Sequence, residues 1–224
     1  MPHKLAKVEH RFNSPGPSPN GLQATPDGLW CVDGVNETLY RLDFATGHTL
    51  FEARAQEGGG VTEGGGGIWI SDSYARSIAR YDPQTGEKIA GYDTPAPGVV
   101  AWSEGQENSK VTGAHGLEWL DGKLYVANPP SQMVHVMDPE GWEEVHRFRT
   151  PGLRPHGLAW ADDGKLWLAD TASGTVCLLD IADGRVYEVI RVEGPTELHG
   201  MTIHDGVLWF CDAITGEIGR LIVE

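Results

Sequence analysis

Apolar and polar residues alternate with a period of two along most of the chain, in short runs separated by turns rich in Gly, Asp and Pro. This period is typical of β-strands with one buried face, and no stretch shows the helical period of about 3.6 residues. Related pentapeptides recur, each with an aromatic residue second and Asp or Asn fifth: LWCVD (29–33), IWISD (68–72), LYVAN (124–128), LWLAD (166–170) and LWFCD (208–212). The pattern predicts an all-β chain built from repeats.

Each pentapeptide belongs to a larger repeat of four predicted strands. A Gly-containing turn precedes it, and before that turn comes a short strand opened by Gly21, Gly60, Gly116, Gly157 or Gly200. Third and fourth strands follow, separated by an Asp–Gly turn in most copies. Repeats of about 42 residues with four strands are typical of β-propellers. We therefore expect a five-bladed β-propeller of four-stranded antiparallel blades.

The propeller is expected to occupy residues 1–224 as one domain. Its blades fall at roughly 15–56, 57–95, 113–150, 151–195 and 196–224. The last repeat has only three strands, and the segment LAKVEHRF near the N-terminus resembles the fourth strand WEEVHRF of the third repeat. We expect residues 4–12 to complete the last blade, which removes two open sheet edges.

Composition limits the partners and the compartment. The net charge is −15, which argues against nucleic acid and anionic membranes as partners. Cys31, Cys177 and Cys211 form no CxxC pair, and the N-terminus has no apolar leader, which predicts a soluble cytoplasmic protein. The oligomeric state stays open.

The residue before each repeat glycine marks the entry to the innermost strand, which rims the central channel of a propeller. The residues there are Asn20, Gly59, His115, His156 and His199. Imidazoles meeting at an axis can ligate a metal or move protons near neutral pH. Alternatively, they are structural side chains that bond to loop carbonyls.

Other features near this rim are candidates for the same site. Glu197 lies two residues before His199, on the same side of an extended segment, where its carboxylate can orient the imidazole. The long connection 96–114 can wall the channel and places Trp102 at its rim. The glycine-rich run 57–67 lacks the lysine of a phosphate-binding loop, so it either permits close packing or leaves room for a ligand.

The acidic and aromatic columns of the pentapeptides recur in every repeat. A residue type that every blade needs is more consistent with architecture than with catalysis. We expect the Asp and Asn residues to hold turns through hydrogen bonds and the aromatic residues to pack between blades.

The stretch HGLAWADDGKLWLADTASGTVCLLD (156–180) resembles the repeat of the virginiamycin B lyase (streptogramin B lyase) propellers, and ELHGMTIHDGVLWFCD extends that likeness to the last repeat. The resemblance implies a lyase that opens a cyclic ester by elimination, with a His base and Mg²⁺. It implies catalytic roles for Glu197, His199 and His156. The departures are five repeats instead of seven, Asn20 in place of a tyrosine, and Ala213 where the lyases carry a metal-binding Glu, with only Asp212 beside it as a weak candidate ligand.

Three functions therefore stay open. The first is a metal-assisted enzyme acting on a small ester or lactone, as a lyase or lactonase with His199 as base, Glu197 as its orienting group and His156 as acid or substrate contact. A variant places one transition metal on His115, His156 and His199. The others are a non-catalytic binding propeller and a scaffold. The cofactor expected for the enzyme is a divalent metal, either Mg²⁺ or a transition metal.

Overall fold

The computed structural model describes residues 3–101, 105 and 109–224. In these residues the regular elements are all β-strands, so the all-β prediction is confirmed. No helix there is long and apolar enough to cross a membrane.

The first half of the chain forms two separate antiparallel sheets, and a third follows the long connection. The sheets contain β2 (Pro19–Thr25), β3 (Gly28–Asp33), β4 (Thr38–Leu42) and β5 (Thr49–Arg54); β6 (Gly60–Gly64), β7 (Gly67–Asp72), β8 (Ser77–Tyr81) and β9 (Lys88–Asp93); and β12 (Leu117–Leu120), β13 (Lys123–Asn128), β14 (Met133–Asp138) and β15 (Glu143–Arg149). Within each sheet, consecutive strands pair antiparallel in chain order.

The remaining strands merge into one eight-stranded sheet of order β16-β17-β18-β19-β1-β22-β21-β20. Its strands are β1 (His3–Asn13), β16 (Pro155–Ala161), β17 (Lys165–Asp170), β18 (Thr175–Asp180), β19 (Val186–Val192), β20 (Leu198–His204), β21 (Val207–Asp212) and β22 (Glu217–Val223). The N-terminal strand pairs antiparallel with β22, from Ala6↔Val223 to Asn13↔Glu217, as the sequence predicted. Its start also pairs parallel with β19, which joins two four-stranded groups.

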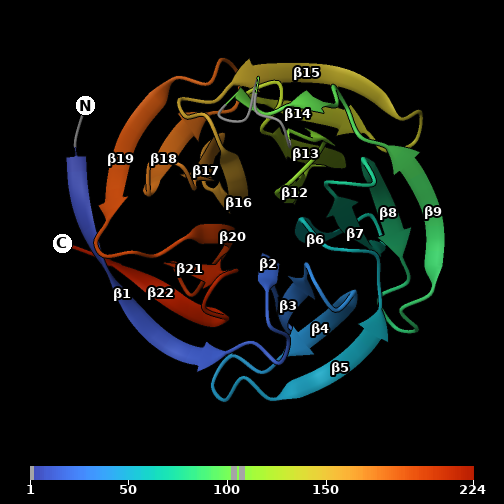
Figure 1. The fold of residues 1–224 in the computed structure, drawn as a ribbon, viewed down its shortest axis with the longest axis horizontal. Coiled ribbons are helices and arrows are strands. Elements are labelled where there is room, and N and C mark those ends of the chain that lie inside the picture. The colour runs from blue at the N-terminus through green and yellow to red at the C-terminus, as the bar shows by residue number, and fades with distance from the viewer. Residues whose placement is uncertain (1–2, 102–104, 106–108) are drawn as a thin grey trace.

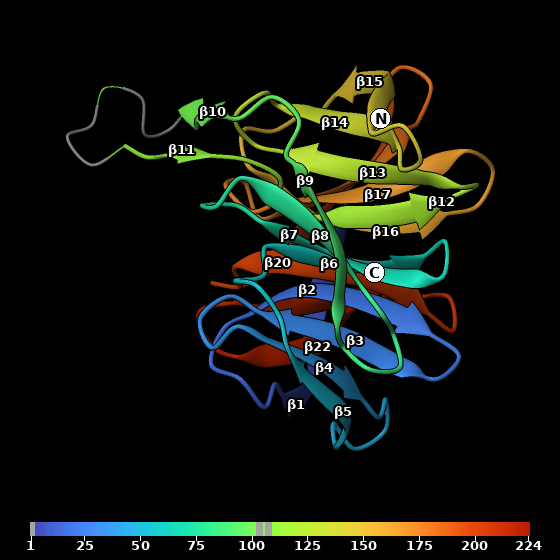
Figure 2. The same ribbon diagram turned by 90° about the vertical axis from the view of Figure 1, so that its right-hand side faces the viewer.

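The sheets stand around a common centre, with β2, β6, β12, β16 and β20 innermost (Figure 1). This arrangement is that of a β-propeller. The long connection forms a short hairpin of β10 (Gly98–Val99) and β11 (Val111–Thr112). Figure 2 shows this hairpin standing out from one end of the ring.

The repeat glycines explain how the inner strands approach so closely. A Cβ on Gly21 would lie 2.7 Å from Gly60 Cα, and one on Gly60 would lie 2.8 Å from Gly116 Cα. The series continues to Gly157 and Gly200, where a Cβ would lie 2.6 Å from Gly21 Cα. No side chain fits at any of these places, so the glycines line a closed circuit around the centre.

The aromatic column packs between sheets, as predicted. Trp30 is 1% exposed and shares a core with Ile68 of the next sheet, and Trp209 shares one with Leu22, back at the start of the ring. The remaining aromatic residues of this column pack against the next sheet in the same way; they are Trp69, Tyr125 and Trp167. Burial of one large ring per interface therefore fastens each sheet to its neighbour.

In the second half of the glycine-rich run 57–67, the absence of side chains allows close packing against the next sheet. The indole of Trp119 lies against the backbone of Gly64 and Gly65, where a Cβ on Gly64 would come within 1.9 Å of Trp119 Cγ. At its first half, Gly59 faces the Ser73 hydroxyl and lines the central cavity. The run thus makes room both for a neighbouring indole and for the site described next.

Candidate active site

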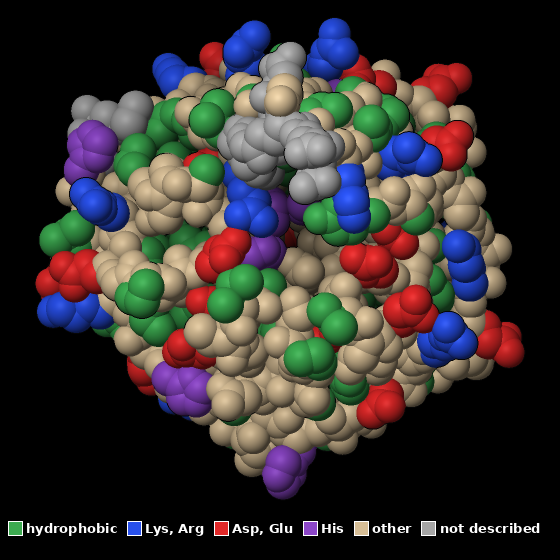
Figure 3. Space-filling view, in the orientation of Figure 1, with side chains coloured by type: hydrophobic (Ala, Val, Ile, Leu, Met, Phe, Trp, Pro, Cys, Tyr) green, Lys and Arg blue, Asp and Glu red, His purple; other side chains and the backbone are tan. Residues whose placement is uncertain are grey.

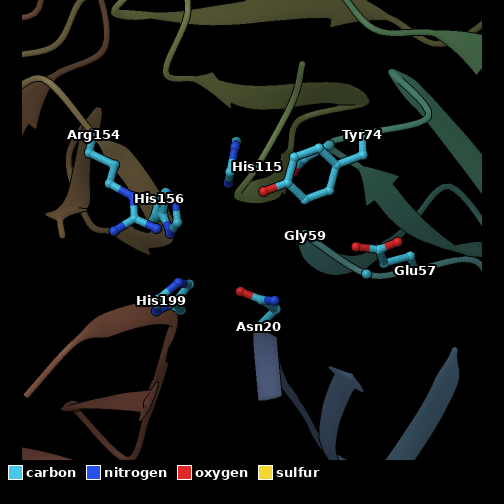
Figure 4. Close-up of a pocket in the computed structure, with 10 residues that line it drawn as sticks. Asn20, Glu57, Gly59, Tyr74, His115, Arg154, His156 and His199 are labelled. Atoms are coloured by element: carbon cyan, nitrogen blue, oxygen red, sulfur yellow. The ribbon is translucent and has the colours of Figure 1, made fainter. Parts of the chain in front are cut away.

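The predicted rim residues meet at one cavity of about 110 Å³. The cavity is lined by Asn20, Gly59, His115, His156 and His199, each within a different inner strand or at most two residues before one (Figure 4). In the space-filling view, histidine side chains lie in a central hollow with basic and acidic side chains beside it (Figure 3). The ring closure therefore brings together residues up to 179 positions apart in sequence, from Asn20 to His199.

The acidic column positions this rim. Asp170 Oδ2 accepts the backbone N–H of Arg154 at 2.7 Å, and Asp212 Oδ2 accepts that of Glu197 at 2.9 Å. Asp33 Oδ2 likewise accepts the N–H of Ser18 at 2.7 Å. Each donor lies two residues before a rim residue, so these carboxylates hold the chain crossing that presents it. The predicted turn hydrogen bonds are also present, since the other oxygens accept N–H groups from the following turns.

Three imidazoles form a continuous cluster. The rings of His115 and His156 stack, with centroids 4.2 Å apart and planes 25° apart, and the His199 ring meets His156 edge-on at 4.6 Å. His156 is 2% exposed, and neither of its ring nitrogens has a hydrogen-bond partner in the described structure. Nε2 of His115 is equally enclosed and unpartnered. Buried polar atoms are rarely left in this state, so the cluster is suited to receive a ligand.

Burial keeps these rings neutral. It lowers the pKa of His115 to about 3 and holds the pKa of His156 well below its usual value. The pKa of His199 is also lowered by burial, but a hydrogen bond to Glu197 opposes that shift. The positive charge of Arg154 lowers the pKa of all three further. At neutral pH each imidazole therefore offers one N–H donor and one lone pair.

The orientation of His199 comes from a backbone atom and not from the predicted carboxylate. Its Nδ1 lies 3.0 Å from the carbonyl oxygen of Glu197. A carbonyl only accepts, so Nδ1 carries the proton and Nε2 keeps the lone pair. The Glu197 carboxylate instead accepts a hydrogen bond from Arg154 Nη1 at 2.7 Å. The prediction that this carboxylate holds the imidazole is therefore corrected.

Sequence reasoning missed Arg154, Ser73 and Tyr74, which line the cavity, and did not single out Glu57 within the glycine-rich run. Arg154 lies two residues before His156, as Glu197 lies before His199, so the same spacing rule applied to every crossing would have found it. Burial and the neighbouring Asp72 raise the pKa of Glu57. No sequence signal marks Tyr74, whose half-exposed ring comes from the turn after β7.

Two predicted residues remain, Trp102 and Asp212. Trp102 falls outside the described residues. Asp212 is buried, and its two oxygens accept three backbone N–H groups, from Glu197, Ile214 and Thr215. These bonds give Asp212 a loop-holding role and argue against the weak metal-ligand hypothesis.

The predicted metal fits these residues poorly. Mg²⁺ prefers oxygen ligands, whereas the three imidazoles supply nitrogen, which suits transition metals. The stacked rings of His115 and His156 do not direct their in-plane lone pairs at a common point. Across the described part of the chain, no group of three or more His, Cys, Asp and Glu residues is arranged to hold a metal. The metal therefore stays a prediction.

The chain is similar in sequence to a curated protein over most of its length. Over 174 residues, 76% of the chain, it is 25% identical to a virginiamycin B lyase from Nocardia farcinica. The match covers 54% of that protein, so the chain spans about half the length of the curated relative. No family model matches the chain.

Solved structures share its fold. The glutaminyl cyclase of Myxococcus xanthus superposes with a TM-score of 0.79 at 14% identity, covering 100% of this chain and 99% of the other. A streptogramin B lyase gives 0.59 at 16% identity, covering 97% of both chains. A Staphylococcus aureus virginiamycin B lyase gives 0.58 at 15% identity, covering 96% of this chain and 99% of the other. The chain resembles the virginiamycin B lyase-like β-propellers. At these identities the structural similarities establish the fold and nothing about function.

Proposed function

We propose that the chain is a small-molecule lyase whose general base is His199, acting at the mouth of a propeller channel. The observation that carries the proposal is the cavity, in which neutral imidazoles with unpartnered nitrogens lie beside Arg154. An unsatisfied buried polar atom costs about 1–3 kcal/mol, so a cluster of them is best explained by a ligand that bonds to it. The sequence likeness to a virginiamycin B lyase favours elimination over other chemistry.

The five-blade count and its boundaries are part of the proposal. The closed circuit of repeat glycines has one member for each expected blade. The eight-stranded sheet divides at the β1–β19 pairing into one group of β16 to β19 and another of β20 to β22 with β1. With the three separate sheets, these groups support the proposal of five blades near residues 15–56, 57–95, 113–150, 151–195 and 196–224 plus 4–12.

His199 is the best base of the three histidines. A general base works best when its pKa lies near the operating pH. The pKa of His115, at about 3, is too low for an efficient base. At His199, the hydrogen bond to the Glu197 carbonyl and the negative charges of Glu197 and Asp212 raise the pKa against burial. The same carbonyl stabilises the imidazolium that forms when Nε2 takes a proton.

In the proposed reaction, His199 Nε2 removes a proton from a carbon next to a carbonyl group. The electron pair forms a C=C bond with the adjacent carbon, whose C–O bond breaks, and the departing carboxylate keeps the electrons of that bond. Arg154 faces the negative charge that develops on the carbonyl oxygen, and His156 donates an N–H to orient the substrate. His199 then returns its proton to water. Each step is carried by side chains of the chain itself.

The cavity limits how much of a substrate it can enclose. Its volume of about 110 Å³ is below the roughly 300–1,000 Å³ typical of sites that bury a whole drug-sized ligand. A large cyclic ester would insert only its reacting bond. A small O-acyl ester of a β-hydroxy amino acid fits the same chemistry.

The test is turnover of virginiamycin B and of O-acyl threonine esters, followed by mass spectrometry. Elimination opens the cyclic ester without a change in mass, whereas hydrolysis adds one water and would contradict the lyase assignment. We expect His199→Ala to lower turnover by about 100-fold or more, the range for loss of a general base. The exposed His48→Ala is the matched control and should keep full activity.

Other outcomes separate the alternatives. Binding of a substrate without turnover, with affinity unchanged in His199→Ala, would establish the non-catalytic propeller instead. Activity that a chelator removes and that Mg²⁺ or a transition metal restores would establish the metal prediction.

A further inference from the structure

A second cavity lies between the β6–β9 and β12–β15 sheets, at the ends of β6 and β12 remote from the imidazoles. Its volume is about 720 Å³, within the range of ligand sites. Gly65, Asp121 and Pro139 mark the turns that surround it. We call it the aromatic groove, after the residues on its floor.

The rings of Trp119, Trp69 and Tyr92 line the floor, and Trp142 packs against the last two without lining the cavity. Trp119 and Trp69 stack with centroids 5.9 Å apart and planes 18° apart. Trp69 is followed by Tyr92 at 5.7 Å and Trp142 at 6.3 Å, and these last two stack at 4.2 Å. Trp119 is only partly buried and is supported from behind by the backbone of Gly64. A partly exposed ring that is supported from behind is a platform for a flat apolar surface.

At the corresponding position between the β2–β5 sheet and strands β20 and β21, an aromatic side chain fills the space. Phe44, which follows the third-strand residue Asp43, stacks on His204 at 3.6 Å and meets Trp209 edge-on at 5.6 Å. Pro139 follows Asp138 in the same way but is much smaller, and it lines the open groove. With the small Pro139 at this position, the Trp119 ring stays partly exposed along the groove, whereas Trp69 is 1% exposed.

The charged groups of the groove carry both signs, and those of Lys123, Asp138 and Arg80 are hydrogen-bonded. Lys123 Nζ lies 2.5 Å from Asp138 Oδ2. The Arg80 guanidinium lies 5.5 Å from the Trp69 ring centroid and donates to the Gly65 carbonyl. Asp121 is exposed at the edge. Glu140 also lines the groove, so three acidic residues face two basic ones, and both donors and acceptors surround the aromatic floor.

We infer that the aromatic groove binds a neutral saccharide. A sugar ring has an apolar face of C–H groups that can stack on Trp119. Its hydroxyl groups both donate and accept, which matches the mixed ring of Lys123, Asp138 and Asp121. This inference is independent of the lyase proposal, because the groove and the imidazole cavity share no residue.

The experiment titrates the whole chain with maltotriose, cellotriose, xylotriose and chitotriose, each to about 10 mM, a range that detects binding weaker than Kd about 1 mM. Calorimetry measures affinity and tryptophan fluorescence reports the floor. We expect at least one sugar to bind and to change the fluorescence. Lys123→Met should lower the affinity for that sugar about tenfold, because one charged hydrogen bond is lost.

The matched control is Lys165→Met, which alters the lysine at the same place in the next sheet, and it should leave affinity unchanged. Trp119→Phe, which shortens the platform while keeping a ring on Gly64, should also weaken binding. Absence of binding by all four sugars would overturn the inference. So would binding that Lys123→Met and Trp119→Phe leave intact, or binding of tetramethylammonium by the groove in place of any sugar.

Discussion

Glu118 is a buried acid that the proposed reaction does not use. The residue is 4% exposed and lies on β12 among the inner strands. Its oxygens accept the backbone N–H groups of Trp119 and Trp160, each at 2.9 Å, and lie 3.4 Å from the Thr62 hydroxyl. Burial outweighs these bonds and raises its pKa from 4.5 to about 7.

This raised pKa predicts a stability that falls with pH. Between about pH 4.5 and 7 the folded protein holds the Glu118 proton and the unfolded chain does not. The contribution of Glu118 to the free energy of unfolding is therefore fully present below pH 4.5. It declines by on the order of 3 kcal/mol as the pH rises to 7. Glu118→Gln should lack that decline, as measured by urea unfolding of both proteins at about pH 5 and about pH 8.

The buried histidines titrate in both proteins, so the difference between them isolates Glu118. Identical pH dependence of the urea midpoint in the wild-type chain and in Glu118→Gln would contradict the prediction.

At the scale of elements, the inner strands depend on the absence of side chains where they meet. A Cβ on Gly157 of β16 would lie 2.3 Å from the His199 carbonyl and 2.7 Å from the Met201 N–H nitrogen. Both obstacles are backbone, so the strands themselves would have to separate. The same contact sets the spacing of the His156 and His199 rings, since each glycine follows its histidine directly.

We therefore expect Gly157→Ala to lower the free energy of unfolding by about 1–3 kcal/mol, as overpacking does. The control is Gly141→Ala, where a Cβ would meet only the flexible side chain of Glu143, and its effect should stay within about 0.5 kcal/mol. Thermal unfolding of the two variants measures this. Equal stability of the two variants would contradict the prediction, because it would mean that the inner strands can separate to admit a Cβ without a loss of free energy.

At the scale of the whole molecule, one strand closes the ring. β1 pairs with β22 on one side and with β19 on the other, and it buries Ala6 and Phe12. Without it, both neighbours would present open edges that can pair with other chains. The circuit of sheets is closed by hydrogen bonds between the two ends of the chain and not by a covalent link.

Removal of residues 3–13 should lower Tm by more than about 10 °C, since each kcal/mol is worth about 2–4 °C at this size and several are lost. We also expect association, visible by size-exclusion chromatography. Lys7→Ala, an exposed change on the same strand, is the control and should behave as the wild-type chain. A truncated chain that stays monomeric with an unchanged Tm would contradict the closing role of β1.

Much of this fold is local information that the sequence determines by itself. The alternation of apolar residues sets each strand, Asp and Gly set the turns, and repetition of the aromatic and acidic columns reveals the repeat. The likeness between residues 5–12 and the third repeat located the closing strand. Convergence of Asn20, His115, His156 and His199 followed from repeat symmetry alone.

Tertiary structure decided which groups touch across the ring. It paired Glu197 with Arg154, gave the orientation of His199 to a carbonyl, buried Glu118 among three strands and exposed Trp119 beside Pro139. The contacts of Glu197 with Arg154 and of Glu118 with Trp160 join residues 43 and 42 positions apart, and their geometry depends on how far neighbouring sheets are staggered and tilted. Period and spacing carry no such information, because they describe one strand at a time, whereas burial and hydrogen bonding at the site arise only when the ring is closed.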